Sequence, residues 1–400
     1  MQPPSVLVAQ LRDYLTAGWE SIDLQRLTVE HFLQPFSRHY FEQESLHTFA
    51  TEWRAAHEAA AVPESAQLPA YSVEGNPPLT ITELGYFMKQ PVKQFFRRRL
   101  KVQFREHALT GMDDEPFSLD KLEQYQVGME LLADSGPPEP LHQVQDRLKE
   151  KLARMKREGR FPIGELAVKL QDELVEELAP VRLAWLALDA CFPRCADKVR
   201  VTLRCAGLAL EDWVDQIRDD GVGKVWMTLS VSRVRNSKSA KVDKKQLRAD
   251  KLVDAYVRQL VLAAQGQAVT GYLVARDCIV QFQPLEQDAA QAWLDTLVAL
   301  WQRGMDAPLP TACKTGLALV AKGAVDAHKA YEGATFRTDG MMAERDEPCL
   351  ARLWADYGDL AAEPGHQEVS EVLYLPLLSW IASSVQIHPL NHMSEQAFAE

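Results

Sequence analysis

Hydrophobic residues recur at helical spacing soon after residue 78. Thr80 and Glu83 form a Ser/Thr-x-x-Glu capping box, which predicts the start of a helix. Pro91 interrupts that helix and suits the first turn of a second one, because its missing N–H would have no helical partner there. We expect the second helix to bury one face and to present a basic face opposite. Its apolar positions are Val92, Phe95, Phe96 and Leu100.

The same spacing predicts further helices over residues 141–158, 166–188 and 247–264, the second with a break at Pro180. Another helix is predicted over residues 284–304. The side chains expected to face the core are Leu141, Val144, Leu148, Leu152 and Met155 in the first of these helices and Ala289, Trp293, Leu297 and Trp301 in the last.

Between these helices the pattern changes to the alternation typical of strands. The predicted strands cover residues 199–203, 208–217 and 224–234, and Asp219-Asp220-Gly221 is a turn signal between the last two. A short hairpin around Arg276-Asp277 joins residues 272–274 to residues 279–282. Helices, a group of strands, a helix and one more strand predict a mixed α/β domain.

The chain divides by composition into three parts. Residues 1–60 are mostly helical in pattern, like the packed end of a larger domain, and residues 61–78 contain four prolines, as a linker would. Residues 79–400 form the mixed α/β domain. Residues 372–385 are too short to span a membrane and contain Pro376, and six cysteines in 400 residues suggest a reducing cytoplasm.

Charge is unevenly distributed along this acidic chain. The formal net charge is −12, which argues against a protein that coats nucleic acid uniformly. Residues 89–105 nevertheless carry a local charge of +7 and residues 233–251 one of +6. These two basic segments are suited either to DNA phosphates or to the acidic surface of a partner protein.

One region resembles the catalytic strands of a metal-dependent nuclease. Such enzymes place an Asp on one strand and Asp-x-Lys on the next, where carboxylates hold Mg²⁺ and the lysine activates water. Asp215 stands at the first position, but Thr228 replaces the second Asp and Ser230 replaces the lysine. A single carboxylate is too little for Mg²⁺, so we expect no metal, no cofactor and no hydrolysis. The alternative is a Mg²⁺-dependent DNA nuclease that uses Asp215 with Glu165, Glu173 or Glu211.

Several motifs together resemble the exodeoxyribonuclease V gamma subunit family, the RecC subunits of RecBCD helicase–nucleases. The strongest is Pro77-Pro78-Leu79-Thr80 followed by Gln90-Pro91-Val92-Lys93-Gln94-Phe95-Phe96-Arg97-Arg98-Arg99-Leu100. Others are Asp114-Glu115-Pro116-Phe117, Gly159-Arg160-Phe161-Pro162, Gly304-Met305-Asp306-Ala307-Pro308-Leu309 and Ala330-Tyr331-Glu332-Gly333. The resemblance implies that this chain is a C-terminal portion of a longer subunit, beginning with a short helical remnant of its helicase-like part.

The resemblance also implies a degenerate PD-(D/E)xK nuclease-like domain, with a mixed sheet flanked by many helices. Nucleases of this fold carry a Gln-x3-Tyr helix after the catalytic strand. Here Tyr256 is present, but Leu252 stands at the Gln position, which would be a third loss beside Thr228 and Ser230.

The implied function is non-catalytic: DNA handling and subunit docking within an exodeoxyribonuclease V holoenzyme that repairs double-strand breaks by recombination. The implied partners are RecB-like and RecD-like subunits and DNA, as a duplex end, a fork or single strands. We expect one of Arg97, Arg98 and Arg99 to pair with protein acids, since a helix cannot direct all three the same way. A scaffold that never touches DNA is a further alternative. The candidate DNA-binding residues are Lys93, Arg97, Arg98, Lys101, Arg105, Arg233, Arg235, Lys238, Lys241, Lys244 and Lys245.

Overall fold

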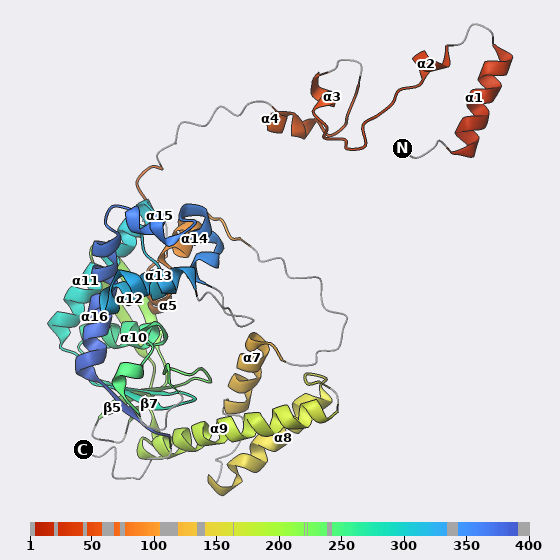
Figure 1. The fold of residues 1–400 in the computed structure, drawn as a ribbon. Coiled ribbons are helices and arrows are strands. Elements are labelled where there is room, and N and C mark those ends of the chain that lie inside the picture. Colours follow the sequence, from red (N-terminus) through yellow and green to blue (C-terminus); the bar gives the residue numbers. More distant parts are fainter. Residues whose placement is uncertain are drawn as a thin grey trace. The chain divides into compact units, whose positions relative to one another are not determined.

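A computed structural model of the chain divides into two compact units, residues 1–69 and 70–400 (Figure 1). The structure describes residues 5–19, 23–42, 46–57, 68–72, 77–104, 119–133, 141–162, 164–219, 221, 223–237, 242–333 and 343–390.

The first unit consists of short helices. They are α1 (Val6–Gly18), α2 (Leu24–Leu27), α3 (His39–Glu42) and α4 (Arg54–His57). Among its described residues only Tyr40 is buried, while hydrophobic side chains such as Leu7, Leu33 and Phe49 are exposed. The predicted helical character of this segment is confirmed, and its origin in a helicase-like domain stays a prediction.

A six-stranded mixed sheet lies at the centre of the second unit, in the order β1-β4-β5-β6-β7-β8. Neighbouring strands are antiparallel except β5 and β6, which are parallel and are connected through α10 (Val253–Ala264). The bounds are β1 (Arg194–Cys195), β4 (Ile217–Asp219), β5 (Lys224–Leu229), β6 (Thr270–Val274), β7 (Ile279–Phe282) and β8 (Val385–His388). The predicted turn after Asp219 joins β4 to β5, and the predicted hairpin joins β6 to β7.

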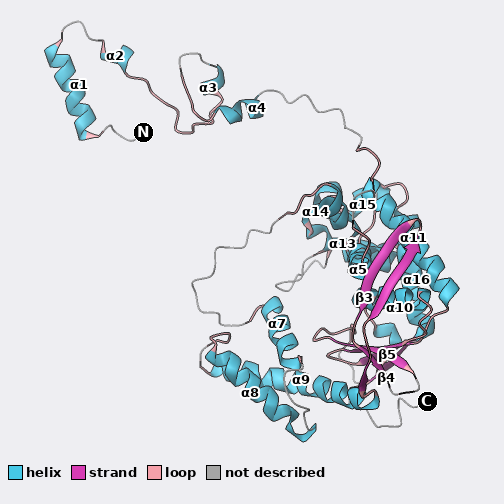
Figure 2. Ribbon diagram, turned by 180° about the vertical axis from the view of Figure 1, so that it is seen from behind, coloured by secondary structure: helices cyan, strands magenta, loops and turns pink. Residues whose placement is uncertain are grey.

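A separate two-stranded ribbon, β2 (Val199–Cys205) and β3 (Leu208–Val214), packs against α10 and against the helices α5 (Ile81–Lys89) and α11 (Gln287–Asp306) (Figure 2). The single strand predicted over residues 208–217 is therefore wrong, because it is divided between β3 and β4. Gln216 adopts a φ of 59°, a left-handed backbone conformation that ends one strand and redirects the chain into the next.

The first predicted helix is confirmed together with its cap. In α5 (Ile81–Lys89), the Thr80 side chain accepts from the Glu83 N–H and the Glu83 side chain accepts from the Thr80 N–H. Pro91 begins α6 (Pro91–Gln94), which continues as a π-helical turn over Phe95–Arg99.

Three helices extend from one face of the sheet: α7 (Lys121–Leu132), α8 (Val144–Arg157) and α9 (Glu165–Cys191). The predicted break at Pro180 is wrong, because α9 continues through it. Pro180 is exposed, while Leu178, Ala179 and Val181 beside it are buried in the core. Burial on both sides of the proline offsets the loss of one helical hydrogen bond.

Two predicted core faces need correction. Leu141 is exposed, because it lies in a 3-10 turn before α8 begins at Val144. In α11 (Gln287–Asp306), Ala289 is exposed and Trp293 is 42% exposed, although Leu297 and Trp301 are buried as predicted. The buried face begins one residue later than predicted, with Ala290 and Leu294, which continue at helical spacing into Leu297 and Trp301.

The remaining helices are α12 (Cys313–Lys322), α13 (Ala324–Glu332), α14 (Pro348–Leu353), α15 (Tyr357–Ala362) and α16 (His366–Ser384). No helix in the described part of the chain is both long and apolar enough to cross a membrane. The sheet lies between two hydrophobic cores, one shared with α10, α11 and α16 and the other with α7, α8 and α9. The predicted mixed α/β class is confirmed.

Candidate functional site

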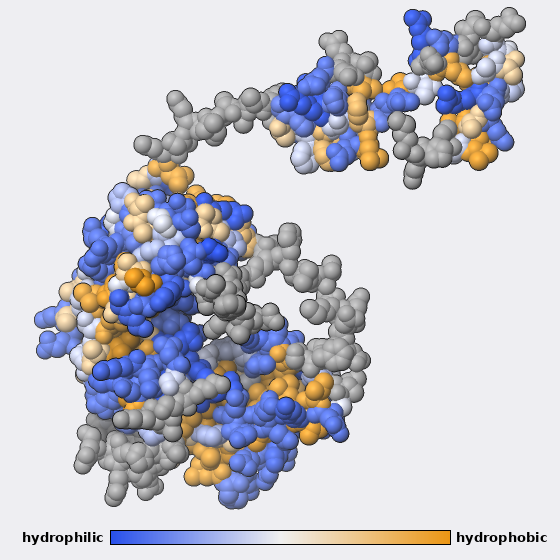
Figure 3. Space-filling view, in the orientation of Figure 1, coloured by the Kyte–Doolittle hydropathy of each residue, from blue (hydrophilic) through white to orange (hydrophobic). Residues whose placement is uncertain are grey.

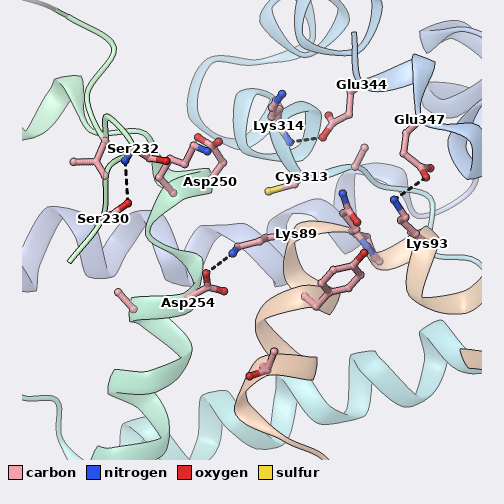
Figure 4. A pocket seen from close by; sticks show the side chains of 18 of the residues that line it. Lys89, Lys93, Ser230, Ser232, Asp250, Asp254, Cys313, Lys314, Glu344 and Glu347 are labelled. Carbon is pink, nitrogen blue, oxygen red and sulfur yellow. Dashed lines mark hydrogen bonds and ion pairs between the residues drawn. The ribbon is translucent and has the colours of Figure 1, made fainter. Parts of the chain in front are cut away.

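A cavity of about 1160 Å³ opens beside the carboxyl end of β5 in the second unit. Its walls come from α5, α6, β5, α7 and the N-terminal ends of α10, α12 and α14 (Figure 4). Successive residues of β5 face opposite cores, Trp226 towards α10 and Met227 towards α9. Because side chains alternate along a strand, Thr228 and Ser230 lie on the Trp226 face, and both line the cavity.

Asp215 lies two residues before β4, close to this position. Ile217 of β4 pairs with Trp226 of β5, and the charge of Asp215 acts on Arg258. Asp215 is exposed. Leu252 and Tyr256 are instead buried in the core against the sheet, where burial raises the pKa of Tyr256.

Arg258 is the residue of this site that the sequence analysis missed. It lines the cavity from α10, and its guanidinium carbon lies 5.2 Å from the centroid of the Trp226 ring. Burial lowers the pKa of Arg258, and the nearby carboxylates of Asp215, Asp254 and Asp212 oppose that effect. Its buried Nη1 has no hydrogen-bond partner within the described ranges. An arginine inside an otherwise mostly apolar helix was the available signal.

Two carboxylates that line the cavity accept hydrogen bonds from backbone N–H groups. Glu344 accepts hydrogen bonds from the N–H groups of Lys314 (2.9 Å) and Thr315 (2.8 Å) at the start of α12, and burial raises its pKa. Glu347 accepts from the N–H groups of Cys349 (2.9 Å) and Leu350 (3.0 Å) and so caps α14.

The other two carboxylates lie beside basic side chains. Asp254 forms an ion pair with Lys89, and Asp250 lies 3.0 Å from the guanidinium of Arg248 (Figure 4). Within the described ranges, no three His, Cys, Asp or Glu side chains are grouped closely enough to hold a metal ion. The residues present therefore do not fit the Mg²⁺ site of a nuclease.

The cavity wall carries more basic than acidic side chains, six against four. Neither Lys251 nor Lys314 has an ion-pair partner within 4.0 Å in the described part of the chain. Burial lowers the pKa of Lys251, and the charges of Arg248, Lys89 and Lys314 act in the same direction, while Asp250 opposes them. The wall can therefore offer positive charge to an anion.

A sequence model of the RecC C-terminal domain matches residues 76–324 of this chain. The chain belongs to the RecC C-terminal domain family. It is 27% identical over 324 residues to the RecBCD enzyme subunit RecC of Escherichia coli K12, covering 76% of this chain and 26% of that protein. It is also 27% identical over 390 residues to the RecBCD enzyme subunit RecC of Mycobacterium tuberculosis, covering 88% of this chain and 31% of that protein. The chain thus spans less than a third of the length of these relatives.

In this RecC C-terminal domain, the first basic segment is largely folded into the protein. The side chain of Arg98 is 13% exposed, pairs with Glu83 and lies over the Trp301 ring, which confirms that one of the three arginines is neutralised internally. Arg97 is exposed, and its guanidinium carbon lies 5.9 Å from the centroid of the Tyr86 ring. Lys101 is also exposed.

Lys93 lines the cavity from α6, 3.7 Å from Glu347. Lys93 and Arg97 also line a second cavity of about 450 Å³, which shares Tyr86, Lys93, Glu347 and Pro348 with the first.

Among the described basic side chains of the second basic segment, Lys251 alone lines the cavity. Arg235 is buried 3.6 Å from Asp277, and Arg233 lies 3.7 Å from Glu177. Lys244 donates to the Ala382 carbonyl at 2.9 Å, and Lys245 is exposed. The candidates Arg105, Lys238 and Lys241 lie outside the described residues.

Proposed function

We propose that the chain is part of a RecC-type subunit of a RecBCD-type helicase–nuclease in double-strand-break repair. In that complex it would handle DNA and dock partner subunits without chemistry of its own. The family match and the printed names of the relatives support this assignment. The activity of the whole enzyme would belong to the assembled complex, of which this chain is a fraction.

The order of elements supports a nuclease-like domain within this proposal. The chain runs from α9 through β1, the inserted ribbon β2–β3, β4 and β5, and then crosses over through α10 to the parallel strand β6. A helix, three antiparallel strands and a parallel crossover follow one another in this order, as in the nuclease fold that the sequence resembles. The catalytic positions would then be Asp215, Thr228 and Ser230.

The side chains at the catalytic positions support the absence of catalysis in this proposal. Thr228 and Ser230 present hydroxyls where a nuclease presents a carboxylate and an amine, and the four carboxylates that line the cavity already hold backbone or lie beside basic groups. Hydroxyl groups are poor ligands for Mg²⁺, which prefers carboxylates and water.

The helices α7, α8 and α9 expose hydrophobic side chains, and these support the proposed docking of other subunits. Leu166 is 52% and Val168 49% exposed on α9, and hydrophobic residues gather in patches on the visible face of α7, α8 and α9 (Figure 3). Large exposed hydrophobic patches on a folded protein are typical of protein–protein interaction surfaces. A RecB-like or a RecD-like subunit is the proposed occupant.

A nuclease assay tests the non-catalytic assignment. We expect no cleavage of end-labelled duplex or single-stranded DNA in Mg²⁺ or Mn²⁺, together with DNA binding that weakens steeply as salt increases. Asp215→Ala should leave the absence of cleavage unchanged, as should the control Asp288→Ala at an exposed position of α11. Cleavage that is lost in Asp215→Ala alone would establish the alternative, a Mg²⁺-dependent nuclease.

A further inference from the structure

Arg258 occupies an unusual position for a cation, because its side chain is only partly exposed and its Nη1 is buried. It stacks on Trp226, which is fully buried and whose Nε1 donates to Gln259 Oε1 at 2.8 Å, so the ring beneath the guanidinium is held in place. No ion pair within 4.0 Å neutralises Arg258 in the described ranges, and its Nη1 is left without a hydrogen bond. Because Nη1 is shielded from solvent, a bound anion would meet the part of the Arg258 side chain that lines the cavity, attracted by its positive charge.

Arg258 supplies a positive charge from the protein at the place where a nuclease site would hold a metal ion. Asp215, the one carboxylate left at the degenerate catalytic positions, acts on Arg258 through its charge. In an active nuclease a metal ion lies between such a carboxylate and the scissile phosphate. Here a fixed guanidinium beside Asp215 can meet a phosphate without any metal.

Further cations extend from Arg258 along the cavity wall. Lys251 ends the 3-10 turn Ala249–Lys251 just before α10, seven residues ahead of Arg258, and both residues line the cavity. The charges of Lys89 and Lys314 act on Lys251, so these side chains lie close together. Figure 4 shows Lys89 on α5 and Lys314 on α12. The second cavity continues this row with Lys93 and Arg97.

We infer that the cavity binds the phosphodiester backbone of a single DNA strand, with Arg258 taking the place of the nuclease metal ion. This inference rests on the proposed DNA-handling function and names the site that carries it out. Spaced cations beside Tyr86 and Tyr125 suit a single strand, because bases stack on aromatic rings while phosphates meet the cations.

Binding of a fluorescent oligothymidylate to the full chain tests the inference. Arg258→Gln should weaken binding at least about tenfold, and the salt dependence should lose about 0.7 of a log–log slope unit, the value for one phosphate contact. Arg303→Gln, which removes the same charge from an exposed site on α11 outside the cavity, should bind like the unaltered chain.

Asp215→Asn gives a second measurement that does not depend on altering a buried side chain. Removing the carboxylate that opposes the phosphate should strengthen binding by up to about fivefold, the effect of one charge at roughly 4 Å in water. Lys251→Gln combined with Lys314→Gln should weaken binding, and folding should be retained because neither lysine has an ion-pair partner within 4.0 Å in the described part of the chain.

The outcomes separate this inference from the proposed function. Normal binding by Arg258→Gln together with no gain in Asp215→Asn would overturn the Arg258 site and leave DNA handling intact. Failure of the unaltered chain to bind any DNA at low salt would count against the DNA-handling function itself. Displacement of the oligonucleotide by polyglutamate at equal charge concentration would show an acidic protein segment as the occupant and would also overturn the inference.

Discussion

At the scale of single residues, the surroundings of a basic side chain decide what it can do. Arg98 and Arg97 are adjacent in the sequence, yet Arg98 pairs with Glu83 inside the protein and Arg97 lies exposed beside the second cavity. Arg258 was not among the predicted residues, because a single charge within an apolar helix stands out less in a sequence than seven basic residues within the segment 89–105. The energetic weight of a charge depends on its burial and its neighbours.

The lowered pKa of Lys251 predicts a pH dependence of DNA binding. Burial and the neighbouring cations Arg248, Lys89 and Lys314 favour the neutral amine, so Lys251 should lose its charge below its ordinary pKa of 10.5. Binding of a single strand should therefore weaken as pH rises towards that value, and less so in Lys251→Arg, whose guanidinium stays charged. Fluorescence anisotropy across this pH range provides the measurement.

The lowered pKa of Lys251 affects the free energy of unfolding in the direction opposite to its effect on DNA binding. Between the lowered pKa and 10.5, the unfolded chain retains a proton that the folded chain has released, so the Lys251 contribution to the free energy of unfolding increases with pH. Equal pH profiles of DNA binding in the unaltered chain, Lys251→Arg and Lys251→Gln would contradict the prediction.

At the scale of elements, periodicity placed most helices and strands, but packing set their limits and faces. α9 tolerates Pro180 because its neighbours are buried, and the buried face of α11 is shifted by one residue. The strand predicted over residues 208–217 is divided by the backbone conformation of Gln216. Such corrections arise because local preferences are small compared with the free energy of burying a large side chain.

The pairing of β5 with β6 predicts a sensitive glycine. Trp226 pairs with Gly271 across the two strands, and a Cβ at position 271 would overlap the Trp226 ring. Gly271→Ala should lower the free energy of unfolding by about 1–3 kcal/mol, the usual cost of overpacking a core, as measured by urea denaturation.

Gly223→Ala is the matched control for this substitution. Gly223 precedes β5, and a Cβ there would meet no atom within 4 Å. Its free energy of unfolding should change by less than about 0.5 kcal/mol, as for ordinary surface substitutions. Equal losses in the two variants would show that the Trp226 contact does not limit position 271.

At the scale of the whole molecule, the sheet and its cavity belong to residues 70–400. The three hydrophobic cores contain no described residue before Tyr71, and the cavity is likewise lined only by residues of the second unit. Three distant parts of the chain, α5–α6, β5–α10 and α12–α14, meet at the cavity.

Deletion of residues 1–69 is therefore predicted to leave the second unit folded. The shortened chain should keep the midpoint of its thermal transition, followed by circular dichroism, and its affinity for single-stranded DNA. Deletion of β8 provides the contrast, because Val385 is buried against β7 and its loss exposes the edge of the sheet. A shortened chain without residues 1–69 that failed to fold would contradict the prediction.

The sequence by itself determined the mixed α/β class, the capped start of α5, the β6–β7 hairpin and the resemblance to the RecC family. These features depend on residues close together in the chain, where spacing, turn residues and caps act directly. Tertiary structure alone decided which basic residues remain available and that Arg258 lies beside Asp215 and Thr228. That arrangement depends on pairing between β4 and β5 and on packing of α10 against the sheet, and interactions between distant residues leave no local pattern in the sequence.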